Sequence, residues 1–260
     1  MPNFIHPSAF VDPSAELGHG VRVGAFAVIE AGVSIGDGCL IDHHAVVHTG
    51  ATLGKDNKVF PHAVVGGEPQ DLKFKGQPSQ IIIGDGNLIR EFTTLNRGTE
   101  EGGGVTRIGD RNLFMAYVHV GHDCQLGSDI VIANSVALAG HCEVGDHATI
   151  GGLTGLHQRG RIGTQAMVGA LSRLSKDVPP FSITNGCDEV KVYGMNKLGL
   201  KRRGFSKEAI SALESAFRIY QDPQLNQSAA VAEMDAIAVK TPEIQVLLDF
   251  VKASDRGIYR

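Results

Sequence analysis

The chain has 260 residues, of which 42% are hydrophobic, and its formal net charge at neutral pH is −4. This charge excludes the chain-wide basic surface typical of nucleic-acid-binding proteins, so we expect no nucleic-acid partner. The N-terminus lacks the basic and apolar segments of a secretory signal, and no run approaches the ~18 apolar residues of a membrane span. We therefore expect a cytoplasmic protein with no membrane span, whose four cysteines are free thiols.

An aliphatic residue recurs every six positions over most of the chain, in residues 5–65, 83–95 and, after a slip in phase, 108–174. Six residues suffice for one short strand and one corner, and three such units close a triangular coil of about 18 residues. The aliphatic side chains would point into the prism. Glycine and other small residues would occupy the corners, where a positive φ or a close backbone approach is required. The sequence therefore predicts a mainly β fold, a parallel β-helix, over residues 1–185.

Two insertions interrupt the repeat, GGEPQDLKFKGQPSQ at residues 66–80 and NRGTEEGGGVT at residues 96–106. Insertions of this kind are often tolerated surface loops, but loops on a rigid scaffold also commonly carry function. The first insertion holds Gln70, Asp71 and Lys73 within a few positions, which favours ligand binding.

Histidines and polar residues recur in the coils that follow the second insertion. A coil of about 18 residues would stack one group of them on a single patch of wall: His122, Asp123, Gly140, His141, His157 and Gln158. His119 would flank this patch from the preceding strand. His122 suits proton abstraction because the ordinary imidazole pKa is about 6.5, and Asp123 could orient it. Gly140, one coil above His122, could offer its backbone N–H to a developing oxyanion.

The repeat ends at Pro179-Pro180 because proline has no N–H for a strand ladder. Residues 186–260 are predicted to form a small α-helical domain. Ser206 is placed to cap a helix with apolar residues three and four positions apart. We expect a second helix over residues 228–240 and a third that begins at Thr241-Pro242-Glu243.

An ordered set of motifs resembles one family of enzymes: GGEPQDLK, NRGT, HVGHDC, LAGHC, LHQ, VPP and GLKRRGF. They are similar to those of the UDP-N-acetylglucosamine O-acyltransferases, which are hexapeptide-repeat proteins with a left-handed β-helix. The resemblance covers residues from about 5 to 205. It implies the left hand of the helix, a homotrimer with clefts between subunits, and transfer of an acyl or 3-hydroxyacyl group. The donor would be acyl carrier protein and the acceptor the 3-hydroxyl of UDP-N-acetylglucosamine, in the first step of lipid A biosynthesis.

The resemblance also implies roles for individual residues. His122 would be the general base, with Asp123 orienting it and the Gly140 amide holding the oxyanion, and no acyl-enzyme would form. Substrate contacts would come from Gln70, Asp71, Lys73, His119, His141, His157, Gln158, Asn196, Arg202 and Arg203, the last three at the nucleotide end. Ala170 would gauge the acyl chain and select an intermediate length. A basic run, Lys197, Lys201, Arg202, Arg203 and Lys207, would also meet the acidic acyl carrier protein.

Several alternatives stay open at this point. The same reaction could act on a 3-amino UDP-sugar. The N-acyltransferase of the same pathway carries an additional N-terminal domain, for which a repeat that begins at Ile5 leaves no room. A zinc enzyme of the γ-type carbonic anhydrase class would need three imidazoles; His43 and His48 have suitable spacing but lack a third partner, so we expect no metal and no cofactor. A non-enzymatic scaffold would not require the cluster around His122.

Overall fold

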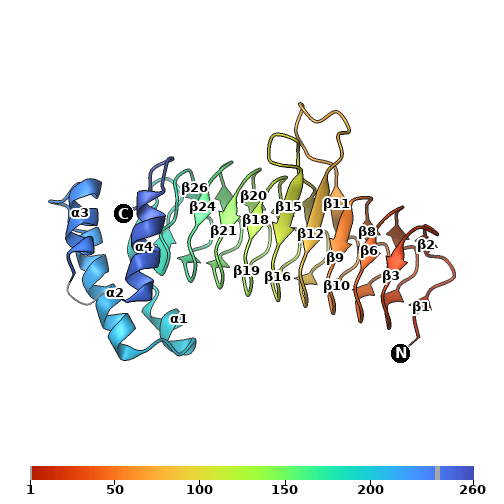
Figure 1. Ribbon diagram of the computed structural model, residues 1–260, viewed down its shortest axis with the longest axis horizontal. Coiled ribbons are helices and arrows are strands. Elements are labelled where there is room, and N and C mark those ends of the chain that lie inside the picture. Colours follow the sequence, from red (N-terminus) through yellow and green to blue (C-terminus); the bar gives the residue numbers. More distant parts are fainter. Residues whose placement is uncertain (1, 238–240) are drawn as a thin grey trace.

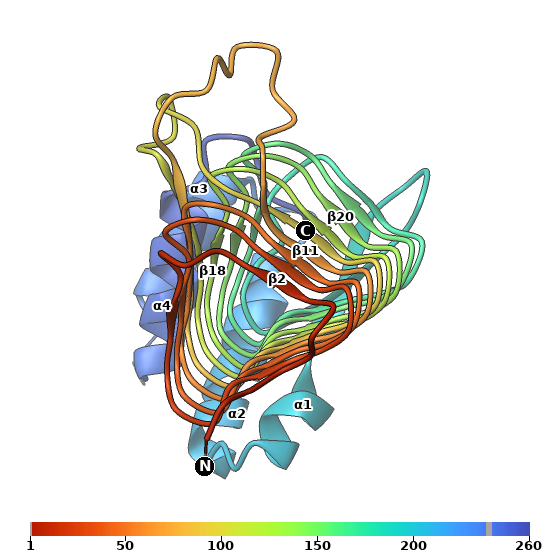
Figure 2. The ribbon, with the colours of Figure 1, turned by 90° about the vertical axis from the view of Figure 1, so that its right-hand side faces the viewer.

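The computed structural model describes residues 2–237 and 241–260 and shows a long triangular prism of short strands, followed by a group of helices (Figure 1). Three sheets form the faces of the prism, and the coils superpose as triangles when viewed along its axis (Figure 2). The left-handed parallel β-helix with a helical C-terminal part, predicted from the sequence, is confirmed.

Each sheet is built from every third strand of the chain as far as β26, and the first sheet ends with β27 and the antiparallel β28. The first sheet contains, in spatial order, β1 (Phe4–Ile5), β4 (Arg22–Val23), β7 (Leu40–Ile41), β10 (Lys58–Val59), β13 (Leu88–Ile89), β16 (Leu113–Phe114), β19 (Val131–Ile132), β22 (Thr149–Ile150), β25 (Met167–Val168), β27 (Ser182–Asn185) and β28 (Lys191–Met195). The second contains β2 (Phe10–Val11), β5 (Val28–Ile29), β8 (Val46–Val47), β11 (Val64–Gly67), β14 (Thr94–Asn96), β17 (His119–Val120), β20 (Ala137–Leu138), β23 (Gly155–Leu156) and β26 (Arg173–Leu174). The third contains β3 (Glu16–Leu17), β6 (Ser34–Ile35), β9 (Ala51–Leu53), β12 (Gln80–Ile83), β15 (Val105–Ile108), β18 (Gln125–Leu126), β21 (Glu143–Val144) and β24 (Arg161–Ile162).

The strand register follows the six-residue repeat. In the second sheet His119 pairs with Ala137 and Ala137 with Gly155, so residues 18 apart lie one above the other. The repeated aliphatic residues point inward and are buried, as Val120, Leu138 and Leu156 illustrate. This register carries side chains from distant positions to neighbouring places on the wall.

The corners confirm one part of the glycine prediction and correct the other. A Cβ on Gly36 would lie 2.6 Å from the backbone of Gly54 in the next coil, so close approach does require glycine there. The left-handed corner position, however, is often held by larger residues, including Phe92 (φ 59°) and Tyr117 (φ 65°). The strand hydrogen bonds on both sides of each corner impose this conformation, although it costs a non-glycine residue of order 1 kcal/mol.

Both insertions leave the prism at the same edge. The first joins β11 to β12 and the second joins β14 to β15, so each spans the corner between the second and third sheets. They project together from the middle of the prism (Figures 1 and 2). The surface beside them is the part of the wall where the histidines stack.

The C-terminal part contains α1 (Lys197–Arg202), α2 (Lys207–Tyr220), α3 (Gln227–Asp235) and α4 (Pro242–Lys252). The Ser206 side chain caps α2, and Pro242 opens α4, as predicted. Helix α3 ends at Asp235, five residues before the predicted end at 240, and residues 238–240 lie outside the described residues. Helix α1 was not foreseen. None of the described helices is long and apolar enough to cross a membrane.

Candidate active site

A cleft of about 550 Å³ runs along the second sheet beside the insertions. Its wall comes from successive coils of the prism, and residues of the first insertion border it. Six of the residues predicted from the sequence line it: Gln70, His119, His122, Gly140, His157 and Gln158. The 18-residue register thus brings most of the expected substrate-binding group to one place.

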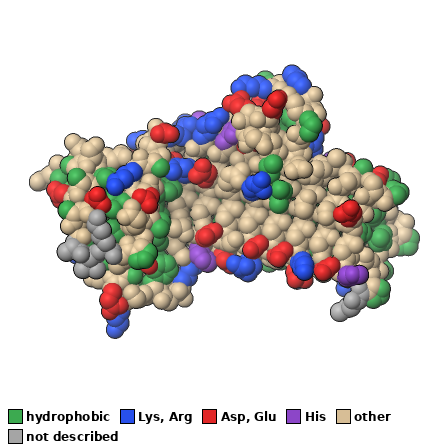
Figure 3. Space-filling view, in the orientation of Figure 1, with side chains coloured by type: hydrophobic (Ala, Val, Ile, Leu, Met, Phe, Trp, Pro, Cys, Tyr) green, Lys and Arg blue, Asp and Glu red, His purple; other side chains and the backbone are tan. Residues whose placement is uncertain are grey.

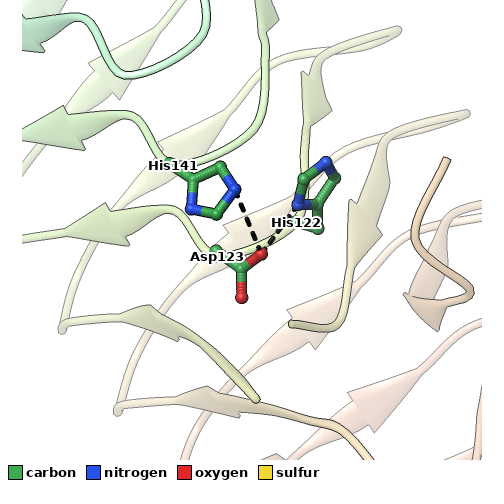
Figure 4. A group of neighbouring side chains, drawn as sticks. All are labelled: His122, Asp123 and His141. Atoms are coloured by element: carbon green, nitrogen blue, oxygen red, sulfur yellow. Dashed lines mark hydrogen bonds and ion pairs between the residues drawn. The ribbon is translucent and has the colours of Figure 1, made fainter. Parts of the chain in front are cut away.

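His122 lies in the wall of the cleft, and the buried Asp123 side chain contacts its ring (Figure 4). The His122 Nδ1 atom donates to Asp123 Oδ2 over 2.7 Å. Both residues are buried, with exposed fractions of 8% and 4%. Since Asp123 holds Nδ1, the Nε2 atom of His122 is the nitrogen left to accept a proton from a ligand.

Thr99 fixes the Asp123 carboxylate from the second insertion. Its backbone N–H donates to Asp123 Oδ1 over 2.7 Å, and its hydroxyl donates to Oδ2 over 2.6 Å. The hydroxyl itself accepts from the backbone N–H of Gly102 at 3.3 Å. A buried carboxylate held by three donors cannot rotate freely, so it orients the His122 ring.

Gly140 faces the His122 ring across one coil spacing. A Cβ on Gly140 would lie 2.5 Å from His122 Cε1 and 2.6 Å from Nε2, so only glycine leaves room for the ring. The Gly140 carbonyl accepts from Arg159 N, whereas its N–H has no acceptor among residues 2–237 and 241–260. A free N–H beside a base is the arrangement that an oxyanion requires.

Two further histidines flank the base in neutral form. The His141 ring lies edge-on to that of His122 at 5.1 Å, and its Nε2 is 3.6 Å from Asp123 Oδ2. Burial lowers the pKa of His141, and the nearby Asp123 offsets this in part. Burial, with a smaller effect from His122, also lowers the pKa of His119, which is hydrogen-bonded to the Thr94 hydroxyl at 2.8 Å. Neutral rings can donate or accept hydrogen bonds with a ligand without adding charge.

The first insertion divides its predicted residues between two places. Gln70 lines the cleft, while Asp71 and Lys73 line a neighbouring hollow. The Lys73 ammonium lies 2.9 Å from Glu101 of the second insertion, and Glu101 also meets Arg159 at 3.1 Å. The two insertions and the wall are therefore linked by one exposed ionic network.

Four further predicted residues lie outside both this cleft and the neighbouring hollow within a single chain. Asn196 caps α1 by accepting from Gly199 N and donates to the Gln165 carbonyl, so it has a structural role here. Arg203 donates to the Gln165 side chain, and Arg202 is exposed. Ala170 is exposed at the corner between the first and second sheets.

One cluster has the donor atoms of a metal site: the ligand atoms of His122, Asp123 and His141 lie within 4.8 Å of one another. Both oxygens of Asp123, however, already accept hydrogen bonds, from Thr99 and His122. This favours a base held by a carboxylate. His43 and His48 pair with separate carboxylates, Asp42 and Glu30, and the absence of a metal and a cofactor stays a prediction.

Sequence reasoning missed Thr99 and Arg256. Thr99 belongs to the NRGT motif, but its contact with Asp123 spans 24 positions and crosses an insertion, where no repeat register applies. Arg256 comes from the C-terminal tail, 99 positions from His157, and its Nη2 lies 3.1 Å from His157 Nδ1. No pattern in the sequence signals that contact.

Comparison with known proteins gives consistent results. Residues 177–259 match the family model described as UDP N-acetylglucosamine O-acyltransferase, domain 2. The chain is 47% identical over 260 residues to an acyl-[acyl-carrier-protein]–UDP-N-acetylglucosamine O-acyltransferase of Paraburkholderia phymatum, with 98% of this chain and 99% of the relative covered.

Solved structures agree with this. The UDP-N-acetylglucosamine acyltransferase of Bacteroides fragilis is 41% identical with a TM-score of 0.96, and the alignment covers 99% of this chain and 100% of that one. The Arabidopsis UDP-N-acetylglucosamine acyltransferase is 31% identical with a TM-score of 0.85, over 99% and 100% of the two chains.

Proposed function

This chain belongs to the UDP-N-acetylglucosamine O-acyltransferase family, and from that premise we propose how its cleft carries out the reaction. The enzyme transfers an acyl group from acyl carrier protein to UDP-N-acetylglucosamine. We propose that the acceptor is the sugar 3-hydroxyl and that the reaction opens lipid A biosynthesis. The observation that supports the mechanism is the His122–Asp123 pair beside the unpaired N–H of Gly140.

The reaction needs one base and one oxyanion donor. The Nε2 atom of His122 takes the proton of the sugar 3-hydroxyl while that oxygen attacks the thioester carbonyl. The resulting tetrahedral oxyanion accepts a hydrogen bond from the Gly140 N–H. Collapse breaks the carbon–sulfur bond, and the protonated His122 returns its proton to the leaving thiolate. Asp123 stabilises the transient imidazolium. General acid–base catalysis by a positioned side chain such as His122 contributes about 10²–10⁴-fold in rate.

We propose that the active form is a homotrimer with clefts between subunits. Asn196, Arg202, Arg203 and Ala170 can join the cleft of the same assembly only if a second copy supplies them, because within one chain they lie outside it. A face for such contact exists. Exposed apolar residues recur along the corner between the first and second sheets, interrupted by His44, His62 and Ser135: Phe26, Phe92, Tyr117, Leu153 and Leu171. Exposed apolar columns of this size are typical of subunit contacts.

Two further features concern the acyl donor, one for the carrier protein and one for the acyl chain. We propose that the exposed basic run on and around α1, Lys197 to Lys207, meets the acidic acyl carrier protein, and that Ala170 limits the chain to an intermediate length. The free cysteines, of which Cys39, Cys124 and Cys142 are buried, agree with work in a reducing cytoplasm.

The test mixes purified protein with UDP-N-acetylglucosamine and a panel of acyl and 3-hydroxyacyl carrier proteins, and follows new acylated nucleotide sugars by mass spectrometry. His122→Ala should abolish the product. His147→Ala, which removes a corner histidine outside the cleft, is the matched control. A parallel reaction with the 3-amino sugar decides between the two acceptors. Product from His122→Ala at the rate of the control would refute the assignment of the base.

A further inference from the structure

Aromatic and imidazole rings stack in a column along the corner between the first and second sheets. Phe26, His44, His62, Phe92 and Tyr117 hold this corner position on successive coils, each with a positive φ. Neighbouring ring centroids lie 5.0–5.1 Å apart, and the planes of each neighbouring pair lie within 19° of parallel. This ring column therefore holds two imidazoles face to face, and the reaction proposed above uses neither of them.

Neither of these imidazoles has a counter-charge. Among residues 2–237 and 241–260, no carboxylate lies within 4.0 Å of the His44 or His62 ring, and neither ring makes a hydrogen bond. Both side chains are exposed in a single chain, so water can solvate a proton that either ring takes up. Protonation of both would place two like charges about 5 Å apart, with no anion beside them to offset the repulsion.

The acids beside the ring column are already engaged. On the same coil as the first imidazole, Asp42 accepts from His43 Nδ1 over 2.9 Å. The His43 ring stands edge-on to both imidazoles of the column, at 5.9 and 6.5 Å. On the coil that follows the second imidazole, Glu91 pairs with Arg90 at 2.9 Å. These carboxylates therefore do not balance a proton on the column, and the remaining titratable group of the column is the Tyr117 phenol at its end.

The corner between the third and first sheets carries paired charges instead. Figure 3 shows acidic and basic side chains along this lower edge of the prism. There His147 lies 3.9 Å from Asp129, which also pairs with Arg111 at 2.8 Å. The ring column, in contrast, exposes Phe26 and Tyr117 at 58% and 60%. Exposed aromatic rings beside imidazoles without a counter-charge indicate a surface that another copy of the chain covers.

We propose that the ring column lies in the contact between copies of the chain, and that protonation of His44 and His62 weakens this contact as the pH falls. The inference rests on the homotrimer proposed above and adds a pH dependence to its assembly. Histidine side chains ordinarily change charge between about pH 5 and 8. Water solvates the protonated rings of a separate chain, whereas a covering copy removes that water and makes the charge costly.

Linkage between protonation and assembly gives the direction of the effect. Because the covered rings exclude protons, separate chains bind more protons than the trimer, and acid therefore favours dissociation. With the ordinary imidazole pKa of about 6.5, each excluded proton raises the dissociation constant about tenfold between pH 7.5 and 5.5. Acid also lowers activity by this route, because the proposed clefts need a second copy.

The experiment removes the titratable groups from the ring column and keeps its rings. His44→Phe and His62→Phe are combined in one variant; Phe26 and Phe92 hold the same corner position with φ of 58° and 59°, so the backbone accepts phenylalanine there. The corresponding double glutamine variant, with smaller side chains, is run in parallel. Sedimentation velocity over a dilution series follows dissociation at pH 7.5 and 5.5, in the urea concentration that half-dissociates the wild type at pH 7.5. Circular dichroism verifies folding, and His147→Phe, the same change at a corner outside the column, is the matched control.

We expect the dissociation constant of the wild type and of His147→Phe to rise about tenfold or more at the lower pH. Both double variants should change less than about twofold, because they have no proton to take up in the column. His62→Arg places a permanent cation in the column, in a left-handed conformation that Arg111 and Arg159 adopt elsewhere with φ of 54° and 62°. At pH 7.5 its dissociation constant should already exceed that of the wild type about tenfold.

Three results would overturn the inference. A wild-type dissociation constant that is the same at both pH values would mean that the contact excludes no proton. An equal rise in the double variants would assign the effect to other groups. A His62→Arg trimer as tight as the wild type would place the column outside the contact. A wild type that is monomeric at pH 7.5 without urea would instead refute the proposed homotrimer.

Discussion

Removal of the Thr99 hydroxyl tests whether the second insertion supports the base. Thr99→Val keeps the shape of the side chain and the backbone N–H bond to Asp123 Oδ1, but it deletes the 2.6 Å hydrogen bond to Oδ2. A hydrogen bond to a charged group contributes about 1.5–3 kcal/mol. If most of this supports the oriented His122–Asp123 pair, kcat should fall about 10- to 100-fold. KM should change little, because Thr99 does not line the cleft.

Steady-state kinetics of Thr99→Val and Thr99→Ser, with melting temperatures, form the assay. Serine restores the hydroxyl, so it should recover most of kcat, which a purely structural role would not require. Asp123→Asn sets the scale, since it removes the negative charge and replaces one of the two accepting oxygens by an NH2 donor. Full kcat in Thr99→Val, together with a large loss in Asp123→Asn, would refute the idea that the insertion orients the base.

Three further changes test other parts of the site. Gly140→Ala should lower kcat strongly without preventing folding, because the added methyl group would lie 2.5 Å from the His122 ring; unchanged kcat would show that the ring has room to move. His119→Gln should reduce the loss of stability on acidification. The folded pKa of His119 is lowered, so the unfolded chain binds the proton more readily and stability falls as the pH drops below about 6.5; melting curves between pH 7 and 5 compare the two proteins. Ala170→Gly should shift the preferred donor to a longer acyl chain in a competition between carrier thioesters, and an unchanged preference would contradict the role of Ala170.

The sequence predicted what the repeat controls. The six-residue period places Val120 and Leu138 in the core, and a multiple of that period places Gly140 over His122. Such contacts can be predicted from sequence spacing alone, because parallel strands with an 18-residue coil bring equivalent positions together. The helix starts at Ser206 and Thr241 were equally readable, since capping is decided within a few residues.

Contacts that leave the repeat were not predictable in this way. The conformation of each insertion depends on tertiary contacts, such as the three hydrogen bonds that Arg97 makes to Ser79, Gly66 and Glu68. The corner conformation of Phe92 also contradicts local preference, because the ladder on both sides overrides it. Residues that act between copies of the chain, as proposed for Asn196, cannot be placed by the register of one copy.

The solenoid and its additions therefore divide the work of the site. The coils place Gly140 one strand separation from His122, and Gln158 one strand separation from Gly140. A reaction at a single carbonyl requires such fixed positions. A uniform wall cannot distinguish one end of a substrate from the other. The difference between the two ends comes from elements outside the repeat: Thr99 of the second insertion contacts Asp123, and Arg256 of the C-terminal tail contacts His157, about two coils away.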